Sequence, residues 1–118
     1  MLTAAMLQLV QECGEGVLIL TDGVVEPEFR HSQLTRAEVR RLLLVVARTL
    51  DALPPEAREA MPEIDLDGWR VVGSALLDDG PGADDAAWFA ASSLLPATLG
   101  WLKLYRREAP QLFDYRPS

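Results

Sequence analysis

Few side chains of this sequence could act as a nucleophile or carry a proton at neutral pH. The chain has one histidine, His31, and one cysteine, Cys13, and nucleophilic catalysis needs a nucleophile beside a base. His31 lies in a polar stretch, where a histidine is usually solvated. Cys13 lies among apolar residues, where a free cysteine packs as a small hydrophobe. Zinc needs three or four His, Cys or carboxylate ligands, and the chain has no glycine-rich phosphate loop. We therefore expect no catalytic residue, no metal site and no cofactor.

Two pairs of carboxylates could serve as a general acid and a general base. These pairs are Asp65 with Asp67, and Asp84 with Asp85. Each pair lies at the expected start of a helix, where a carboxylate commonly accepts hydrogen bonds from free backbone N–H groups. We interpret both pairs as helix-capping residues.

Acidic residues gather in the middle of the chain. Positions 51–85 hold ten acidic and two basic residues, a net charge of −8, and the other positions hold eight acidic and nine basic residues, a net charge of +1. A protein with a total charge of −7 repels phosphate backbones, so on the basis of charge we do not expect nucleic acid as a partner. We interpret the acidic stretch as a solvated surface; a face for a basic partner or a metal ion is the alternative.

The aromatic residues offer the candidate contact positions. Trp69, Trp88 and Trp101 lie at or near positions that should face inward, so packing in the core is the first interpretation. A ligand pocket between helices, lined by the same tryptophans, is the alternative. Tyr105 on the last helix and Phe113 in the tail complete the set of candidate ligand or interface residues.

Apolar residues three and four positions apart predict that these side chains are carried by helices. We expect long helices near 3–20, 35–53 and 84–108, and short helices near 55–61 and 67–77. Thr35 and Glu38 have the spacing of a capping box, which predicts that the second long helix starts there.

Four segments are assigned less simply than these helices. Residues 17–25 fit either the end of the first helix or a short hairpin, and we favour the helix because no further strand is available as a partner. Residues 21–34, with Pro27, are expected to form a polar loop. Pro96 lies within the last apolar stripe, so it either kinks one helix or starts a new one. Residues 109–118 are expected to form a tail that frays or folds back.

The amino-acid composition is typical of a globular protein. The 118 residues are 49% hydrophobic and 25% charged, which is the balance of one globular domain covering residues 1–118. One cysteine excludes an intramolecular disulfide and fits a reducing, cytoplasmic setting. The apolar run Leu42–Ala47 is far shorter than the roughly 18 residues that a membrane span needs. We expect an all-α, up-and-down helical bundle.

The order of several landmarks resembles the HepT-like branch of the HEPN superfamily, over about residues 7–105. The landmarks are Glu28-Phe29, Leu34-Thr35-x-x-x-Val39, Leu53, Pro62-Glu63-Ile64, Trp69-Arg70, Gly73, Trp88 and Leu95-Pro96. This resemblance implies a small all-helical protein from a toxin–antitoxin setting, often paired with a minimal nucleotidyltransferase.

The chemistry of that family rests on an Arg, a short gap, and then His-x-Tyr. In the family the Arg and His support RNA cleavage, and the partner can nucleotidylate the Tyr. The corresponding stretch here, 73–80, has no Arg, His or Tyr, and His31 is followed by Ser32 and Gln33. We therefore expect a non-catalytic bundle that acts through protein–protein contact, as a homodimer or with another protein such as a nucleotidyltransferase-like partner. A bundle that binds a small apolar ligand and a HEPN-type ribonuclease toxin are the alternatives.

Overall fold

The computed structural model describes residues 2–78 and 80–113, and helices account for most of them. Its elements, in chain order, are α1 (Leu2–Thr21), α2 (Glu26–His31), α3 (Gln33–Asp51), α4 (Pro55–Ala60), α5 (Leu66–Leu76), α6 (Pro81–Phe89), a π-helical turn (Ala90–Leu94), α7 (Leu95–Glu108) and a 3-10 turn (Pro110–Phe113). No strand occurs among the described residues. The predicted all-α helical bundle is therefore confirmed.

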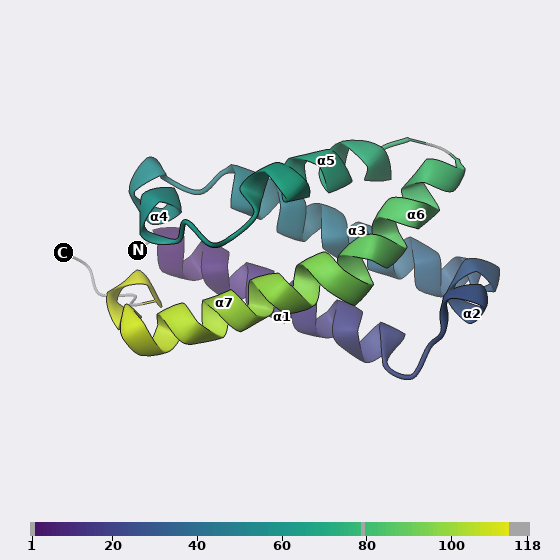
Figure 1. Ribbon diagram of the computed structural model, residues 1–118, viewed down its shortest axis with the longest axis horizontal. Helices are drawn as coiled ribbons and strands as arrows, with labels where there is room; N and C mark the ends of the chain where they lie inside the picture. Colours follow the sequence, from purple (N-terminus) through teal and green to yellow (C-terminus); the bar gives the residue numbers. More distant parts are fainter. Residues whose placement is uncertain (1, 79, 114–118) are drawn as a thin grey trace.

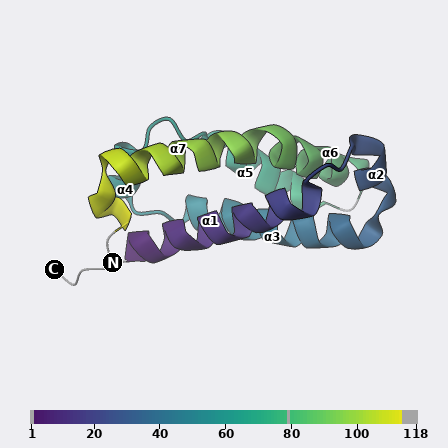
Figure 2. The ribbon, with the colours of Figure 1, turned by 90° about the horizontal axis from the view of Figure 1, so that it is seen from below.

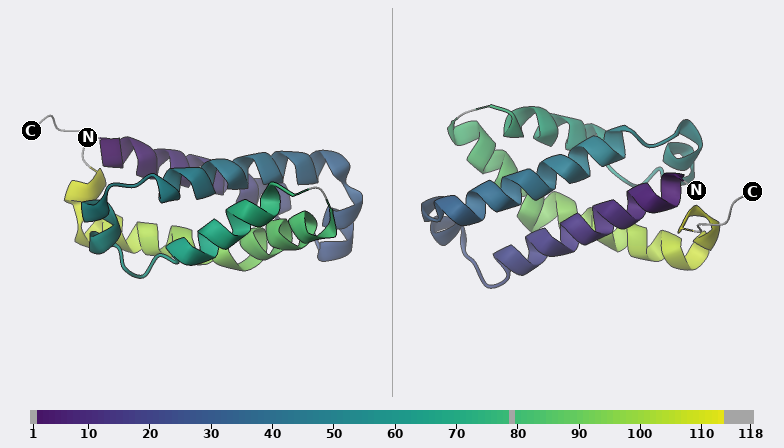
Figure 3. Two further views of the ribbon diagram at one scale, coloured as in Figure 1. Left: turned by 90° about the horizontal axis from the view of Figure 1, so that it is seen from above. Right: turned by 180° about the vertical axis from the view of Figure 1, so that it is seen from behind.

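Four helical rods run up and down in two layers. Helices α1 and α3 pack against each other and form one layer, while α5 and the rod made of α6 and α7 form the other. The layers are separated clearly in Figure 2, and the right panel of Figure 3 shows α1 beside α3. The bundle measures 48 × 26 × 22 Å along its principal axes. No described helix is both long enough and apolar enough to cross a membrane.

The hydrophobic core lies between the two layers and takes side chains from every rod. Its fully buried members include Leu7, Val10, Val17, Phe29, Leu43, Leu50, Trp69, Leu76, Leu95 and Leu102. Burying a large apolar side chain contributes about 1.5–3 kcal/mol, so this shared core is the main source of stability.

Glycines in α1 allow close approach to its neighbours. A Cβ on Gly14 would lie 3.0 Å from the Cδ1 atom of Leu95 in α7, and one on Gly16 would lie 3.3 Å from the Cδ1 atom of Leu42 in α3. A helical glycine costs roughly 1 kcal/mol relative to alanine, and at both positions the missing Cβ leaves room for a leucine of the neighbouring helix. The helix runs to Thr21 and a turn at Gly23, with φ +72°, follows, so the hairpin alternative is wrong.

The expectation of a loop over residues 21–34 is also wrong in part, because α2 forms within it. Pro27 lies in the first turn of α2, where a proline is tolerated because its missing N–H would have no partner. Glu26 accepts hydrogen bonds from Arg30 one turn later, at 2.8 Å from Nη2. Phe29 is fully buried and fixes this short helix to the core.

The start of α3 differs from the predicted capping box at Thr35 and Glu38. The N-cap is Ser32, whose hydroxyl oxygen accepts a hydrogen bond from the Thr35 N–H. Glu38 instead pairs with Arg41 on the solvated side of the helix. The helix begins earlier because Phe29 holds the preceding turn against the core, so Ser32 already lies at the helix entrance.

The last predicted helix, 84–108, begins earlier and contains a π-helical turn. It starts at Pro81 rather than Asp84, and Pro96 falls in the first turn of α7. Just before it, the Leu95 N–H bonds the Ala90 carbonyl, five residues back. Because proline lacks an N–H and crowds the preceding turn, the wider turn lets the rod continue past Pro96.

The remaining boundaries follow the sequence closely. The short helices occupy Pro55–Ala60 and Leu66–Leu76, and Asp65 caps the second through the Gly68 N–H at 2.8 Å. Phe113 is half-buried and packs against the core. Residues 114–118 of the predicted tail lie outside the described residues.

Candidate functional site

The three tryptophans lie in three separate places. Trp69 is buried, and its Nε1–H donates to Thr98 Oγ1 at 2.9 Å. Trp88 is half-buried, with its ring centroid 5.3 Å from that of Phe29. Trp101 is 37% exposed on the outer side of α7. The structure therefore brings no two of them into one pocket, and they form no common tryptophan-lined cavity.

The other predicted contact residues lie at the end of the bundle formed by α7 and the C-terminal turn. The rings of Trp101 and Tyr105 are stacked with centroids 6.2 Å apart, and Tyr105 is buried. Arg106 lies over the Phe113 ring, 4.6 Å from its centroid. Of these residues, Trp101 alone presents a large apolar surface to solvent.

The nucleophile and proton-carrier candidates are also not assembled into a site. His31 is exposed at the end of α2, with Nδ1 2.9 Å from the Pro27 carbonyl oxygen. Cys13 is half-buried, and burial raises the pKa of its thiol; Arg41 opposes this shift and Glu12 adds to it. The described residues hold no group of three or more His, Cys, Asp or Glu that could bind a metal ion.

Acidic residues of the middle stretch are engaged by arginines rather than by one another. Arg70 Nε lies 2.8 Å from Asp51, Arg36 Nη1 lies 2.9 Å from Asp84, and Arg30 Nη2 lies 2.6 Å from Asp85. The hydrogen bond from Arg70 lowers the pKa of the Asp51 carboxyl. Asp84 and Asp85 thus bind different arginines, and this arrangement suits structural ion pairs better than a shared acid–base site.

The outer side of the α6–α7 rod is an extended surface of small and aromatic side chains. We call it the α6–α7 face; its exposed residues are Asp85, Phe89, Ser93, Pro96, Ala97, Gly100, Trp101, Lys103 and Arg107. No charged residue occurs between Asp85 and Lys103. Phe89 is 51% exposed. An open depression of about 540 Å³ lies around Gly100, bordered by Ala97, Trp101 and Leu104. In Figure 1 the rod lies on the near side of the bundle, with no helix in front of it.

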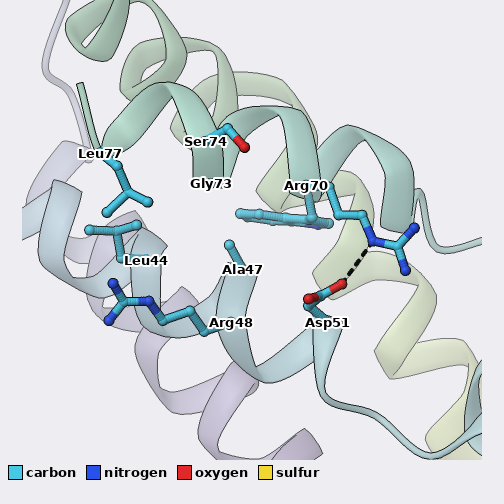
Figure 4. Close-up of a pocket in the computed structure, with 9 residues that line it drawn as sticks. Leu44, Ala47, Arg48, Asp51, Arg70, Gly73, Ser74 and Leu77 are labelled. Atoms are coloured by element: carbon cyan, nitrogen blue, oxygen red, sulfur yellow. Dashed lines mark hydrogen bonds and ion pairs between the residues drawn. The ribbon is translucent and has the colours of Figure 1, made fainter.

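A second feature is a groove between α3 and α5, which we call the α3–α5 groove (Figure 4). It has a volume of about 300 Å³ and is lined by Leu44, Ala47, Arg48, Asp51, Trp69, Arg70, Gly73, Ser74 and Leu77. Figure 4 shows Leu44 and Leu77 facing each other at one end and the Asp51–Arg70 ion pair at the other. The floor is apolar and the rim is polar, which is the usual composition of a small-molecule site.

Comparison of the chain with protein-family models, curated proteins and solved structures finds no match. The resemblance to HepT-like proteins therefore stays a prediction from the sequence.

The prediction from sequence named one residue at each surface, Trp101 on the α6–α7 face and Trp69 in the α3–α5 groove, but it outlined neither surface. The α6–α7 face has a signal in the sequence: a long uncharged run with acidic residues before it and basic residues after it. The α3–α5 groove has a weaker one, because Ala47 and Gly73 are small residues within two of the predicted helices. Small residues at such positions usually allow two helices to pack closely, and only less often do they leave room for a ligand-binding site.

Proposed function

We propose that this protein is a non-catalytic helical bundle that works through protein–protein contact, with the α6–α7 face as its contact surface. The single observation that carries the proposal is an exposed helical face with no charge between Asp85 and Lys103 and with two large aromatic side chains in solvent. Apolar side chains that gather on one exposed face mark interaction sites on many proteins.

A second copy of the chain is the partner that the charges of this face favour. The face has Asp85, which also binds Arg30 of its own chain, at its α6 end and the basic residues Lys103 and Arg107 at its α7 end, so an antiparallel copy would place unlike charges opposite each other. Asp85 lies eleven residues before Pro96, and Arg107 lies eleven residues after it. A two-fold axis at Pro96 would therefore pair Asp85 with the Arg107 of the other copy twice, as an isologous interface requires.

The shape of the face fits the same arrangement. Phe89 lies seven residues before Pro96, so in the antiparallel pair it would lie opposite Lys103, within one turn of Gly100. A Cβ on Gly100 would meet no atom within 4 Å, and the depression there is open. The exposed Phe89 ring of one copy can enter this depression on the other.

The energetics predict a weak dimer rather than an obligate one. Phe89 and Trp101 are each partly buried already, so removing the rest of their surface contributes on the order of 1 kcal/mol per side chain. Association costs several kcal/mol in lost freedom of motion. The contact is a single pair of helical faces, so dimer formation should depend on protein concentration.

The resemblance to HepT-like bundles suggests a biological role for this contact surface. A bundle that lacks the Arg and His-x-Tyr residues of that family would keep the scaffold and its contacts, in a role derived from a toxin–antitoxin component of the cytoplasm. A nucleotidyltransferase-like protein on the same face is then the alternative partner, and it is the interpretation to pursue if the chain does not self-associate.

The proposal is tested by sedimentation velocity over a wide range of protein concentrations. We expect the unmodified chain to form dimers as the concentration rises, and the double variant Phe89→Ser/Trp101→Ser to remain a monomer. Matched controls are Ile19→Ser and Leu34→Ser, which remove apolar side chains that are 76% and 86% exposed outside the α6–α7 face. A monomer at all concentrations would overturn self-association, and equal effects of the control variants would overturn the choice of face.

A further inference from the structure

The α3–α5 groove is a short depression, open to solvent, with a pair of side chains at each end that limits its length. Leu44 faces Leu77 at one end, and the ion pair between Arg70 and Asp51, 2.8 Å apart, spans the two helices at the other. A volume of about 300 Å³ is at the small end of the range for ligand sites. This space fits a small molecule better than a helix or an extended peptide, both of which would need an open end.

The floor of the groove is apolar and held in place. A Cβ on Gly73 would lie 3.3 Å from the Ala47 Cβ, so the two helices approach closely and neither contributes a large side chain above this point. Trp69 lines the groove beside them, and its hydrogen bond to Thr98 fixes the indole ring. A rigid apolar floor of this kind suits the aliphatic or aromatic part of a ligand.

The rim supplies one positive charge that no carboxylate among the described residues neutralises. Arg48 is exposed and makes no ion pair with the residues that the structure describes. Arg70, in contrast, is bound by Asp51 and also lies 3.4 Å from Asp67. Figure 4 shows the Arg48 guanidinium on the opposite side of Ala47 from the Asp51–Arg70 pair, so an anion at Arg48 would avoid the Asp51 carboxylate.

We propose that the α3–α5 groove binds a small amphipathic anion, with its carboxylate or sulfonate on Arg48 and its apolar part over Ala47 and Gly73. This site is independent of the α6–α7 face, since the two share no residue.

Decanoate, decanol and decyltrimethylammonium separate the contributions of tail and charge. We expect NMR titration of the full-length protein with decanoate to shift the backbone amide signals of Gly73 and Ser74. Decanol should bind more weakly by about tenfold, because one charge-assisted hydrogen bond is worth about 1.5 kcal/mol or more. The cationic analogue should bind least.

Variants then assign the site. Arg48→Gln should weaken decanoate binding about tenfold and leave decanol binding unchanged, and Ser74→Leu should fill the groove and weaken both. Arg41→Gln, which removes another exposed arginine of α3, is the matched control. The proposal is overturned if decanoate does not bind, if the cation binds as well, or if Arg48→Gln and Arg41→Gln have equal effects.

Discussion

The Trp69 indole donates a hydrogen bond from Nε1 to Thr98 Oγ1 over 2.9 Å, and both side chains are buried. The Thr98 hydroxyl in turn donates to the Leu94 carbonyl at 2.8 Å. That carbonyl belongs to the π-helical turn before Pro96. This chain of hydrogen bonds connects α5 to the α6–α7 rod at its least regular point, and it helps to fix which side of the rod faces solvent.

Replacing Thr98 with valine should destabilise the protein by about 1–3 kcal/mol. The substitution keeps the shape of the side chain but leaves the buried Trp69 N–H without an acceptor, which costs its full desolvation penalty. Urea unfolding monitored by circular dichroism gives the free energy. In a double-mutant cycle with Trp69→Phe, the two changes should be less than additive.

Thr21→Val is the matched control for that cycle. The Thr21 hydroxyl also donates to a carbonyl one turn earlier, at 2.9 Å from Val17, but it has no tryptophan partner and is only half-buried. A loss of stability as large as that of Thr98→Val, or strict additivity in the cycle, would show that the connection between the helices is not energetically important.

Two glycines should respond to substitution with opposite signs. Gly100→Ala should stabilise the monomer by about 0.5–1 kcal/mol, because the new Cβ meets no atom within 4 Å and alanine favours the helix. Gly73→Val should destabilise it by about 1–3 kcal/mol, because the Ala47 Cβ is already close and the core must shift. Urea unfolding at low protein concentration measures both; a gain for Gly73→Val would contradict the close packing of α3 and α5.

The spacing of apolar residues was sufficient to predict most of the helices. The errors in helix position arose where tertiary packing overrides local sequence signals. Pro27 suggested a loop, yet a proline in a first turn is compatible with a helix, and burial of Phe29 holds α2 in place. The same packing moves the start of α3 from Thr35 to Ser32. A sequence alone does not show which of two possible caps the core will select.

The Asp51 carboxyl should titrate below its usual pKa because Arg70 donates a hydrogen bond to its charged form. Arg70→Gln should raise that pKa toward the normal value, which carbon-detected NMR of the carboxyl signal can follow. Any stabilisation from this exposed pair is present above the pKa of the unfolded chain and is lost as the pH falls through the lower pKa of the folded state. An unchanged pKa in Arg70→Gln would contradict this ion pair.

The Cys13 thiol should react slowly with iodoacetamide near neutral pH. Burial raises its pKa, and the thiolate is the reactive form. The pH at which alkylation reaches half its maximal rate should lie higher for the folded protein than for the protein in urea. Arg41→Gln should raise it further, because the Arg41 charge favours the thiolate. Equal pH profiles for the folded and unfolded chains would rule out a raised pKa.

The candidate surfaces were harder to foresee than the helices. Trp69, Trp88 and Trp101 were expected to face inward. Each packs against different neighbours in the structure, so their distances from one another could not be predicted from the sequence. The π-helical turn adds a further shift, because one extra residue per turn rotates α7 relative to α6. Which side of the rod is exposed therefore depends on a local feature that helix periodicity does not contain.

Reversing the two charges at the ends of the α6–α7 face is a direct test of antiparallel self-association. Sedimentation velocity compares Asp85→Arg, Arg107→Asp and the double variant, with Arg30→Gln as a control because Arg30 pairs with Asp85 inside the chain. Each single change creates like charges across the antiparallel interface and should weaken the dimer about fivefold or more. The double variant should restore the dimer and Arg30→Gln should keep it. A double variant as monomeric as both single variants would contradict antiparallel self-association.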